Sequence, residues 1–430
     1  MTVFQVLARK SIKQSYCPSK EILCLMHHYR QMTNDAIRIG LANNNVSALK
    51  KLSMLSYKEL KRYRNVPSCY KLCAISKAAG ILASRKKSIK RGHPTKDPYL
   101  KKSIVVSCYS FKIVNGELRI PIGRGKYEFI SLNAHTVKIL ASDPDIKVRS
   151  FTLTERSLSL CIAKEVPEIT GITSAAGIDR NLRNLATGNP SRVAYYDMNK
   201  IVEIGETTKG IIKSFVRNDF RIRKRITSKY GRRKKNRTQS ILNLVSNDII
   251  TFCSLNRLAI VFEDITNIRS MYGKGNYQGR KYRRMMNNNW PFTEIKRLIE
   301  YRANWQGIPV IRLTKKETRG TSLECYICGE RLQEPLKSDA EHKRELWCIA
   351  CKRWFDRDLV AVMNIFRRGW VRFAQSHNVK GLESEAVRGN PQTPTVILRV
   401  DSSKLGQRKE WSREFMRSSF ADQRPNRTIS

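Results

Sequence analysis

Four cysteines stand in two pairs that have the spacing of metal ligands. Two residues separate Cys325 from Cys328 and Cys348 from Cys351, and nineteen residues lie between the pairs. A two-residue spacer lets both thiolates of a pair reach one ion, and four sulfurs complete the closed tetrahedral shell of structural zinc. His342 lies between the pairs and could replace a thiolate, although four cysteines already satisfy zinc. The sequence therefore predicts a zinc ribbon, which stabilises a small fold but does not itself cut a substrate.

Two carboxylates stand where a buried strand would otherwise carry an apolar residue. Asp179 follows Gly-Ile inside an apolar segment, and Glu263 ends the segment Leu-Ala-Ile-Val-Phe-Glu. Removing a carboxylate from water is costly unless it is paired or binds a cation. Asp264 is the weaker candidate, because neighbouring residues on a strand face opposite sides.

A third carboxylate follows the ribbon in a segment with helical periodicity. At about 100° per residue, Leu359, Val362 and Ile365 share one apolar arc, and Asp358 falls within it. Asp356 falls on the polar side and is better explained as a helix cap. Asp358 is therefore the residue that we expect to be buried.

Each of these acids alone could simply pair with an arginine. Together, two strand carboxylates and one helix carboxylate suit a two-metal phosphodiesterase, in which bridged ions activate water and stabilise the leaving 3′-oxygen. Carboxylate oxygens match Mg²⁺ or Mn²⁺, whereas thiolates match Zn²⁺. We therefore predict that Asp179, Glu263 and Asp358 converge in space.

The charge of the chain indicates a polyanionic partner. Its 430 residues include 82 Lys and Arg against 36 Asp and Glu, a formal charge of +46, and 41% of them are apolar. A compact body with this charge repels itself unless an anion neutralises it, and nucleic acid is a stronger candidate than a membrane surface. No apolar stretch reaches the 18 residues of a spanning helix, and the start lacks the features of a secretory signal. The odd total of 11 cysteines favours a reducing compartment, so we expect a cytoplasmic, nucleoid-associated protein.

One segment concentrates this positive charge. Ten Lys and Arg and no acid lie between Arg221 and Arg237. Such runs are usually solvated, but like charges four apart destabilise a helix unless a polyanion offsets them. The predicted nucleic-acid contacts are Arg221, Arg223, Lys224, Arg225, Arg232, Arg233, Lys234, Lys235 and Arg237.

The elements that must position these residues fall into successive regions. Helical periodicity follows a weak opening strand, and strand-like runs separated by turn signals then predict a small β-barrel with a helical insertion. Alternating strands and helices follow, which indicate an α/β domain. The predicted regions are a β-barrel (1–18 and 100–168), a helical lobe with a basic linker (19–99), an α/β domain (169–320 and 353–370), the zinc ribbon (321–352) and a poorly ordered tail (371–430).

These motifs resemble those of the TnpB family, transposon-encoded RNA-guided DNA nucleases related to type V CRISPR effectors. Residues 177–187, 260–265 and 356–365 are similar to the three RuvC motifs of the family, and Cys325–Gly329 resembles the start of its zinc element. The specific similarity covers about residues 170–370. It departs at Val360, where the family usually has Asn, and at Arg180, where a small or apolar residue is common.

The resemblance implies a fold and a function. It implies an RNase H-like (RuvC) domain with a zinc-ribbon insertion, preceded by a wedge-like β-barrel with a helical recognition lobe. It assigns the Mg²⁺ or Mn²⁺ ligands to Asp179, Glu263 and Asp358. The implied partners are a guide RNA, which pairs with target DNA, and the DNA that the RuvC site cuts.

Two other functions remain open at this point. One is a guided DNA-binding regulator that has lost cleavage, although such a protein would be expected to have replaced its acids. The other is a zinc-ribbon transposition factor that binds nucleic acid without catalysis and needs no buried carboxylates. A transposase that joins DNA ends would use similar acids and differ by strand transfer.

Overall fold

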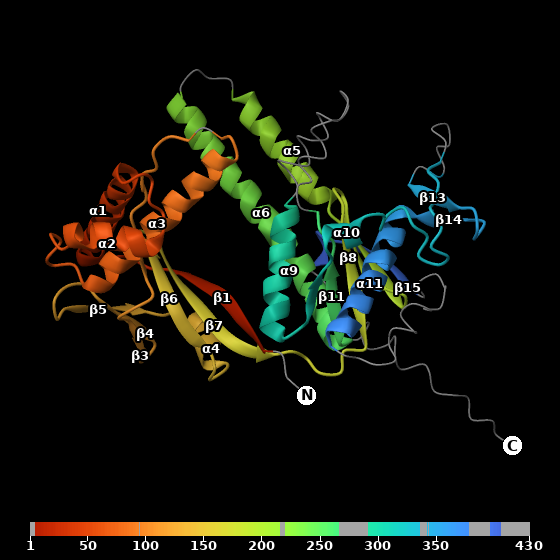
Figure 1. Ribbon diagram of the computed structural model, residues 1–430, viewed down its shortest axis with the longest axis horizontal. Helices are drawn as coiled ribbons and strands as arrows, with labels where there is room; N and C mark the ends of the chain where they lie inside the picture. The colour runs from red at the N-terminus through yellow and green to blue at the C-terminus, as the bar shows by residue number, and fades with distance from the viewer. Residues whose placement is uncertain are drawn as a thin grey trace. The chain divides into compact units, whose positions relative to one another are not determined.

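The chain forms two compact units in the computed structural model. The structure describes residues 5–93, 95–215, 220–265, 291–335, 342, 344–377 and 396–405. One unit is Leu7–Glu165, and the other joins Met1–Val6 to Val166–Ser430. Both contain helices and sheets (Figure 1). The chain is therefore a mixed α/β protein with more than one domain, as its sequence predicts.

The helices of the first unit follow the predicted apolar spacing. They are α1 (Lys20–Ala42), α2 (Leu49–Leu60), α3 (Ser68–Lys90) and α4 (Ala134–Ala141). The Ser19 side chain caps α1 by accepting a hydrogen bond from the amide of Ile22 at 3.1 Å. Leu25, Met26 and Tyr29 on α1 are buried in a core that α3 shares.

The strands of this unit pair in two sheets. A four-stranded sheet has the order β1-β7-β6-β2, and a three-stranded sheet has the order β3-β4-β5. The strands are β1 (Gln5–Ser15), β2 (Ile104–Ser107), β3 (Lys112–Val114), β4 (Glu117–Pro121), β5 (Tyr127–Ser131), β6 (Lys147–Thr154) and β7 (Ser157–Pro167). Closure of these sheets into a barrel stays a prediction.

A mixed six-stranded sheet forms the centre of the second unit, with the order β12-β11-β8-β9-β10-β15. Strands β8, β9 and β10 are antiparallel neighbours, whereas β11 runs parallel to both β8 and β12. The strands are β8 (Ser174–Arg180), β9 (Asn184–Asn189), β10 (Arg192–Asp197), β11 (Leu258–Phe262), β12 (Val310–Arg312) and β15 (Val396–Asp401).

Helices pack on both faces of this sheet. The apolar side chains of Ile178 and Phe262 pack with α5, α6 and α9 on one face, whereas Ala175 and Val261 pack with α11 on the other. Figure 1 shows α11 running along β8 and β11. The helices are α5 (Asn199–Ser214), α6 (Phe220–Leu255), α9 (Phe292–Gln306), α10 (Lys315–Thr318) and α11 (Arg357–Ser376). None of the helices in the described ranges is long and apolar enough to cross a membrane.

The predicted poorly ordered tail, 371–430, needs a correction. Helix α11 continues to Ser376, and Val396–Asp401 forms β15 at the edge of the central sheet. Strand β15 pairs in parallel with β10, and Val400 is buried in the core. Periodicity did not reveal this strand because it is short and its sequence, VILRVD, does not alternate apolar with polar residues. The rest of the tail after residue 405 lies outside the described residues.

Candidate functional site

Strand alternation directs Asp179 and Glu263 to the same face of the sheet. Ile178 on β8 is paired with Phe262 on β11, so the next residues along these parallel strands, Asp179 and Glu263, are neighbours. Both face the side on which α11 packs, and each is only 8% exposed. The carboxylates therefore lie at the carboxyl ends of two adjacent strands.

Helix α11 brings the third carboxylate to this edge. The Asp356 side chain caps α11 by accepting hydrogen bonds from the amides of Asp358 and Leu359, both at 2.9 Å, which confirms its predicted capping role. Asp358 lies in the first turn and is 5% exposed. The helix approaches β8 closely at Gly177, where a Cβ atom would lie 2.7 Å from the amide nitrogen of Phe366.

Two asparagines connect the acids. The Asn181 amide nitrogen donates to Asp179 Oδ2 at 2.6 Å and lies 2.9 Å from Asp358 Oδ1. Asn184 donates to the other oxygen of Asp358 at 2.7 Å. Because one amide group contacts both aspartates, residues that are far apart in the sequence share one small site.

Arg180 holds Glu263 from the opposite face of the sheet. Its backbone amide lies 3.3 Å from Glu263 Oε1, and its guanidinium donates to the backbone carbonyls of Glu263 at 3.1 Å and Phe292 at 3.2 Å. The side chain is 2% exposed, and Nε lies 3.5 Å from Glu263 Oε1. The departure from the family pattern at this position thus places a buried cation beside the site.

Arg344 lies directly before the two-stranded hairpin of the ribbon (residues 345–356) and contacts Asp358. Its guanidinium forms an ion pair with Asp358 Oδ2 at 2.6 Å, and its backbone carbonyl accepts a hydrogen bond from the Arg357 amide at 3.1 Å. The Arg344 side chain is 61% exposed, so this ion pair reaches solvent.

Burial raises the pKa of all three carboxyl groups. The pKa of Asp179 is raised well above its ordinary value, first by burial and then by the charges of Glu263 and Asp358. Burial also raises the pKa of Glu263, against the lowering effect of Arg180. For Asp358, burial raises the pKa, and the hydrogen bond from Asn184 and the charge of Arg344 oppose it. The chain thus concentrates negative charge that it does not fully neutralise.

The donor chemistry of the site fits a hard divalent cation. Three carboxylates supply oxygen ligands, and the buried Oδ1 atom of Asn184 has no hydrogen-bond partner within the described ranges. The carboxylate oxygens of Asp179, Glu263 and Asp358 do not all lie within 4.8 Å of one another. In the described part of the chain, the group of metal-ligand atoms that meets this distance is that of the four cysteines.

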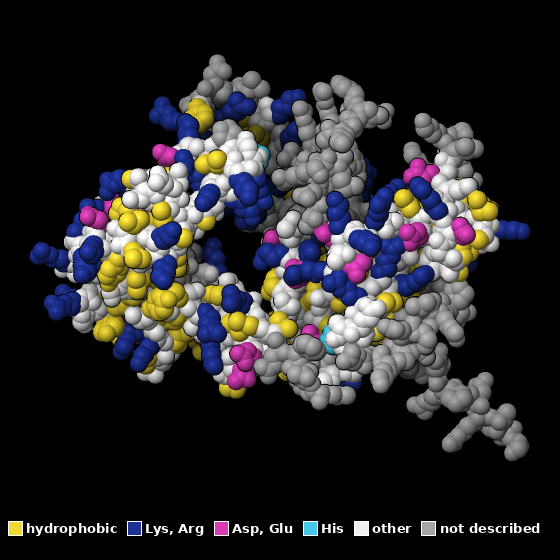
Figure 2. All heavy atoms as spheres, in the orientation of Figure 1, with side chains coloured by type: hydrophobic (Ala, Val, Ile, Leu, Met, Phe, Trp, Pro, Cys, Tyr) yellow, Lys and Arg dark blue, Asp and Glu magenta, His cyan; other side chains and the backbone are white. Residues whose placement is uncertain are grey.

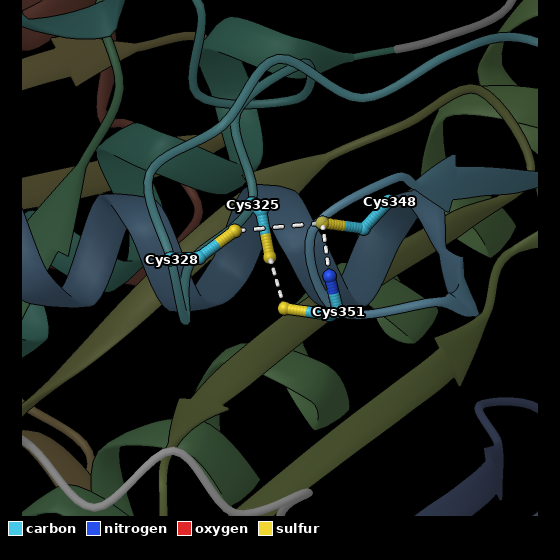
Figure 3. Close-up of side chains that lie close together, drawn as sticks. All are labelled: Cys325, Cys328, Cys348 and Cys351. Atoms are coloured by element: carbon cyan, nitrogen blue, oxygen red, sulfur yellow. Dashed lines mark hydrogen bonds between the residues drawn. The ribbon is translucent and has the colours of Figure 1, made fainter.

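The cysteines converge tightly. Sγ atoms of Cys325 and Cys351 are 3.8 Å apart, and those of Cys328 and Cys348 are 3.4 Å apart. The four side chains point toward one another from two loops (Figure 3). Tetrahedral zinc with Zn–S bonds of about 2.3 Å requires sulfurs about 3.8 Å apart. This cluster could therefore hold zinc.

His342 has another role in the described structure. Its ring stacks on Trp354 with centroids 4.2 Å apart, and Nδ1 contacts Glu345 at 2.5 Å. The hairpin of β13 (Glu345–Cys348) and β14 (Arg353–Asp356) carries both partners. The histidine therefore packs on the ribbon hairpin, while the cysteines supply the sulfur atoms.

The basic segment forms the first half of α6. The predicted contact residues are exposed, except Lys234, which is half-buried, and the second half of the helix packs Leu242, Val245 and Ile249 into the core. Lys and Arg side chains spread over much of the molecular face drawn in Figure 2. The second half of α6 thus packs in the apolar core, and the first half carries a largely exposed set of lysine and arginine side chains.

Sequence reasoning missed three residues at the carboxylate site. Asn181 lies in the turn between β8 and β9, Asn184 is the first residue of β9, and Arg344 is one of many surface arginines. The positions of Asn181 and Asn184 just after Asp179 were an available signal, because a turn beside a strand end faces the same edge. Nothing in the local sequence marks Arg344.

Known proteins share several of these features. Residues 292–365 match the family model described as the TNB domain of Cas12f1-like proteins. A TnpB-like protein of Methanocaldococcus jannaschii is 30% identical over 178 residues, which cover 41% of this chain and 59% of that relative. A second TnpB-like protein of the same organism is 26% identical over 345 residues, or 76% of each chain. The cryo-EM structure of a Cas12f1–sgRNA–target DNA complex aligns over 83% of this chain and 98% of its own, with 16% identity and a TM-score of 0.32.

The four cysteines and Asp358 lie within the residues that match the family model, whereas Asp179 and Glu263 precede them. The chain is similar to TnpB-like proteins in sequence. The alignment with the first relative spans 59% of its length.

Proposed function

We propose that the chain is an RNA-guided DNA endonuclease of a transposable element, which cuts phosphodiester bonds at a two-metal site of the RuvC type. The observation that carries the proposal is that the Asn181 amide contacts the buried carboxylates of both Asp179 and Asp358, while Glu263 follows the residue paired with Ile178 on the neighbouring strand. The mixed strand order with antiparallel β8–β10 and parallel β11 supports an RNase H-like domain. Similarity to TnpB-like proteins and to the TNB domain of Cas12f1-like proteins supports a guide RNA and target DNA as partners.

In this proposal Asp179, Glu263 and Asp358 hold Mg²⁺ or Mn²⁺, which supplies an activated water and stabilises the leaving 3′-oxygen. Asn181 fixes the two aspartates relative to each other, because its amide contacts both. Arg180 orients Glu263 through contacts to its backbone and carboxylate. The burial of the carboxylates limits competing water around them.

The cationic half of α6 binds nucleic-acid phosphates in this proposal. Its exposed arginines and lysines neutralise a backbone without reading its sequence, which base pairing with the guide would supply. The cysteine cluster holds Zn²⁺ and keeps the ribbon hairpin packed on α11, since Cys325 and Cys348 share a core with Leu359 and Val362.

The decisive experiment starts from protein purified with its bound RNA. The RNA is sequenced, and a plasmid that carries the matching target is incubated with and without Mg²⁺. We expect cleavage by the parent protein and by Asp264→Asn, and a loss of at least about 1,000-fold for Asp179→Ala. Cleavage that survives Asp179→Ala would contradict the catalytic assignment.

The same experiment separates the alternatives. RNA-dependent binding of the matching plasmid without cutting would favour a guided regulator. The absence of bound RNA would contradict guidance and leave a zinc-ribbon binding protein. Joining of DNA ends in place of simple cutting would favour a transposase.

A further inference from the structure

Two cysteines outside the ribbon lie against each other in the unit formed by residues 7–165. Cys73 lies on α3, and Cys108 directly follows β2. Their Sγ atoms are 3.9 Å apart, although the two positions differ by 35 residues along the chain. Among the residues that the structure describes, the four ribbon cysteines form the only group of three or more close metal-ligand side chains. The contact between Cys73 and Cys108 is therefore a thiol pair and not part of a metal site.

The core of this unit holds the backbone on both sides of the pair. Ile75 on α3 and Val105 on β2 are buried in the same hydrophobic core. The Ser107 hydroxyl donates to the carbonyl of Tyr109 at 2.9 Å and accepts a hydrogen bond from its amide at 3.2 Å, which fixes the turn that carries Cys108. A disulfide requires sulfurs about 2.0 Å apart, so these sulfurs need to approach by about 1.9 Å, which side-chain rotation can supply.

The two thiols differ in exposure and therefore in reactivity. Cys108 is exposed, whereas Cys73 is buried. Burial raises the pKa of Cys73 to about 11, so its thiol keeps its proton near neutral pH. Because the thiolate is the nucleophile, Cys108 is the thiol that reacts first with an oxidant, and Cys73 lies beside it to react second.

A pocket with a volume of about 1580 Å³ gives access to both thiols. Its described lining residues include four lysines and no carboxylate; the lysines are Lys50, Lys58, Lys61 and Lys77. A positive surface attracts anions, and glutathione disulfide carries a net negative charge. The pocket is large enough for a small peptide of this kind.

We propose that Cys73 and Cys108 are a redox-responsive pair, which a small anionic disulfide such as glutathione disulfide converts into an intrachain disulfide. The Cys108 thiolate attacks one sulfur of glutathione disulfide, whose S–S bond breaks and releases one glutathione thiolate. Cys73 then gives its proton to water, and its sulfur attacks Cys108 Sγ, so that the second glutathione leaves as a thiolate. Two electrons thus pass from the cysteine pair to glutathione disulfide, and the two leaving thiolates take up the two protons.

This chemistry makes the state of the pair depend on the thiol–disulfide balance of its surroundings. A reducing compartment keeps both thiols free, and an excess of glutathione disulfide joins α3 to the residue that follows β2. The pair lies in a different unit from the carboxylate site and the ribbon cysteines.

Mass spectrometry of the full chain tests the proposal, because trypsin places each relevant cysteine on its own peptide. Cys69, Cys73 and Cys108 lie on residues 65–71, 72–77 and 103–112 respectively. The protein, supplied with Zn²⁺, is incubated with glutathione disulfide near neutral pH, and released zinc is measured in parallel. We expect a disulfide between the second and third peptides without zinc release, and recovery of both free peptides when excess reduced glutathione is added.

Two variants separate the steps of the reaction. Cys73→Ser should accumulate the mixed disulfide of glutathione with Cys108, since the thiol that would displace the second glutathione is absent. Cys108→Ser changes an exposed residue and should leave Cys73 unmodified. A disulfide that forms equally between Cys69 and Cys108 would overturn the proposal. Oxidation of the ribbon cysteines with zinc release, while Cys73 stays free, would also overturn it.

Thermal melting gives a second measurement on the full chain. The melting temperature of the oxidised parent should exceed that of the reduced parent by about 5–10 °C, because the disulfide constrains the unfolded chain between its two cysteines. The matched control Cys69→Ser, one turn before Cys73 on α3, should keep this shift, and Cys108→Ser should lose it. An unchanged melting temperature of the parent, or an equal shift in Cys108→Ser, would overturn the proposal. Neither experiment involves DNA cleavage, so failure of the proposed nuclease activity would leave both results unaffected.

Discussion

The fold makes the ionised form of Asp179 unfavourable. Its pKa is raised above the ordinary value of 3.8 by burial and by the neighbouring Glu263 and Asp358. As the pH rises past 3.8, the unfolded chain releases a proton that the folded chain still holds. The free energy of unfolding therefore decreases with rising pH across that window.

This linkage predicts that Asp179→Asn stabilises the protein in the absence of added divalent ions. Asparagine keeps the shape and removes the ionisation, so the variant should melt at a higher temperature than the parent at pH 7. The difference should shrink as the pH falls toward 4. Thermal melting over this pH range measures it, with Asp264→Asn as the control. A variant that is less stable at pH 7 would contradict the assignment of repulsion at this site.

Arg180 permits a second prediction at the residue scale. Its guanidinium is buried against Glu263 and Phe292, and removing one partner of a buried ion pair leaves the other charge uncompensated. Arg180→Met should therefore decrease the free energy of unfolding by about 3–5 kcal/mol. The double variant Arg180→Met with Glu263→Met should recover much of that loss, since both charges are then absent. Urea unfolding of the parent protein, of Arg180→Met, of Glu263→Met and of the double variant tests the coupling, and additive effects would refute it.

Individual residues differed in how far the sequence could predict them. The capping role of Asp356 followed from helical geometry, because only nearest neighbours in the chain determine it. Asn181 and Asn184 follow closely after Asp179, which was a local signal, but their contacts with the distant Asp358 follow only from the tertiary structure. Arg344 was equally invisible, since its contact depends on where the ribbon hairpin lies against α11.

At the scale of elements, the packing of α11 on β8 determines where Asp358 lies. Gly177 allows this approach, because a Cβ atom there would meet the backbone of α11. Gly177→Ala should therefore destabilise the protein by about 3 kcal/mol through overpacking. Gly210→Ala is the matched control: this glycine lies in α5 with no atom within 4 Å of an added Cβ, so alanine should stabilise by about 0.5–1 kcal/mol. Similar effects of the two changes would contradict the close approach.

We expect the ribbon hairpin to depend on bound metal. Cys325 and Cys348 are buried in a core with Phe355 and Val360, so loss of the metal should loosen the hairpin and its contact with α11. We expect one zinc ion per chain by elemental analysis, and loss of that zinc in Cys348→Ser. His342→Gln should retain zinc, because the histidine stacks on Trp354. Zinc loss in the histidine variant would instead make it a ligand.

The elements themselves were predictable where their pattern is local. The apolar spacing of α1 and α11 located these helices, whereas β15 escaped notice because its stability comes from pairing with β10. The register between β8 and β11 could be inferred only after the sheet order was known. Pairing between distant strands depends on tertiary structure, which the spacing of residues along one segment does not encode.

For the whole molecule, the excess of positive charge opposes the compact state. A formal charge of +46 repels itself, and the cationic half of α6 concentrates part of it. Salt screens repulsion between exposed charges over a distance of about 10 Å at 0.1 M. The melting temperature of the RNA-free protein should therefore rise by several degrees between low and moderate NaCl concentrations.

A polyanion should do more than salt, because it neutralises neighbouring cations together. Heparin at the same ionic strength should raise the melting temperature further in the parent protein, and by a smaller amount in a variant with Arg223, Arg232 and Arg237 changed to glutamine. The control with Lys96, Lys138 and Lys147 changed to glutamine loses the same charge elsewhere. An equal response of the two variants would mean that net charge alone governs stability. If heparin raises the melting temperature less in the α6 variant but not in the control, α6 is the region where a nucleic-acid backbone relieves the repulsion.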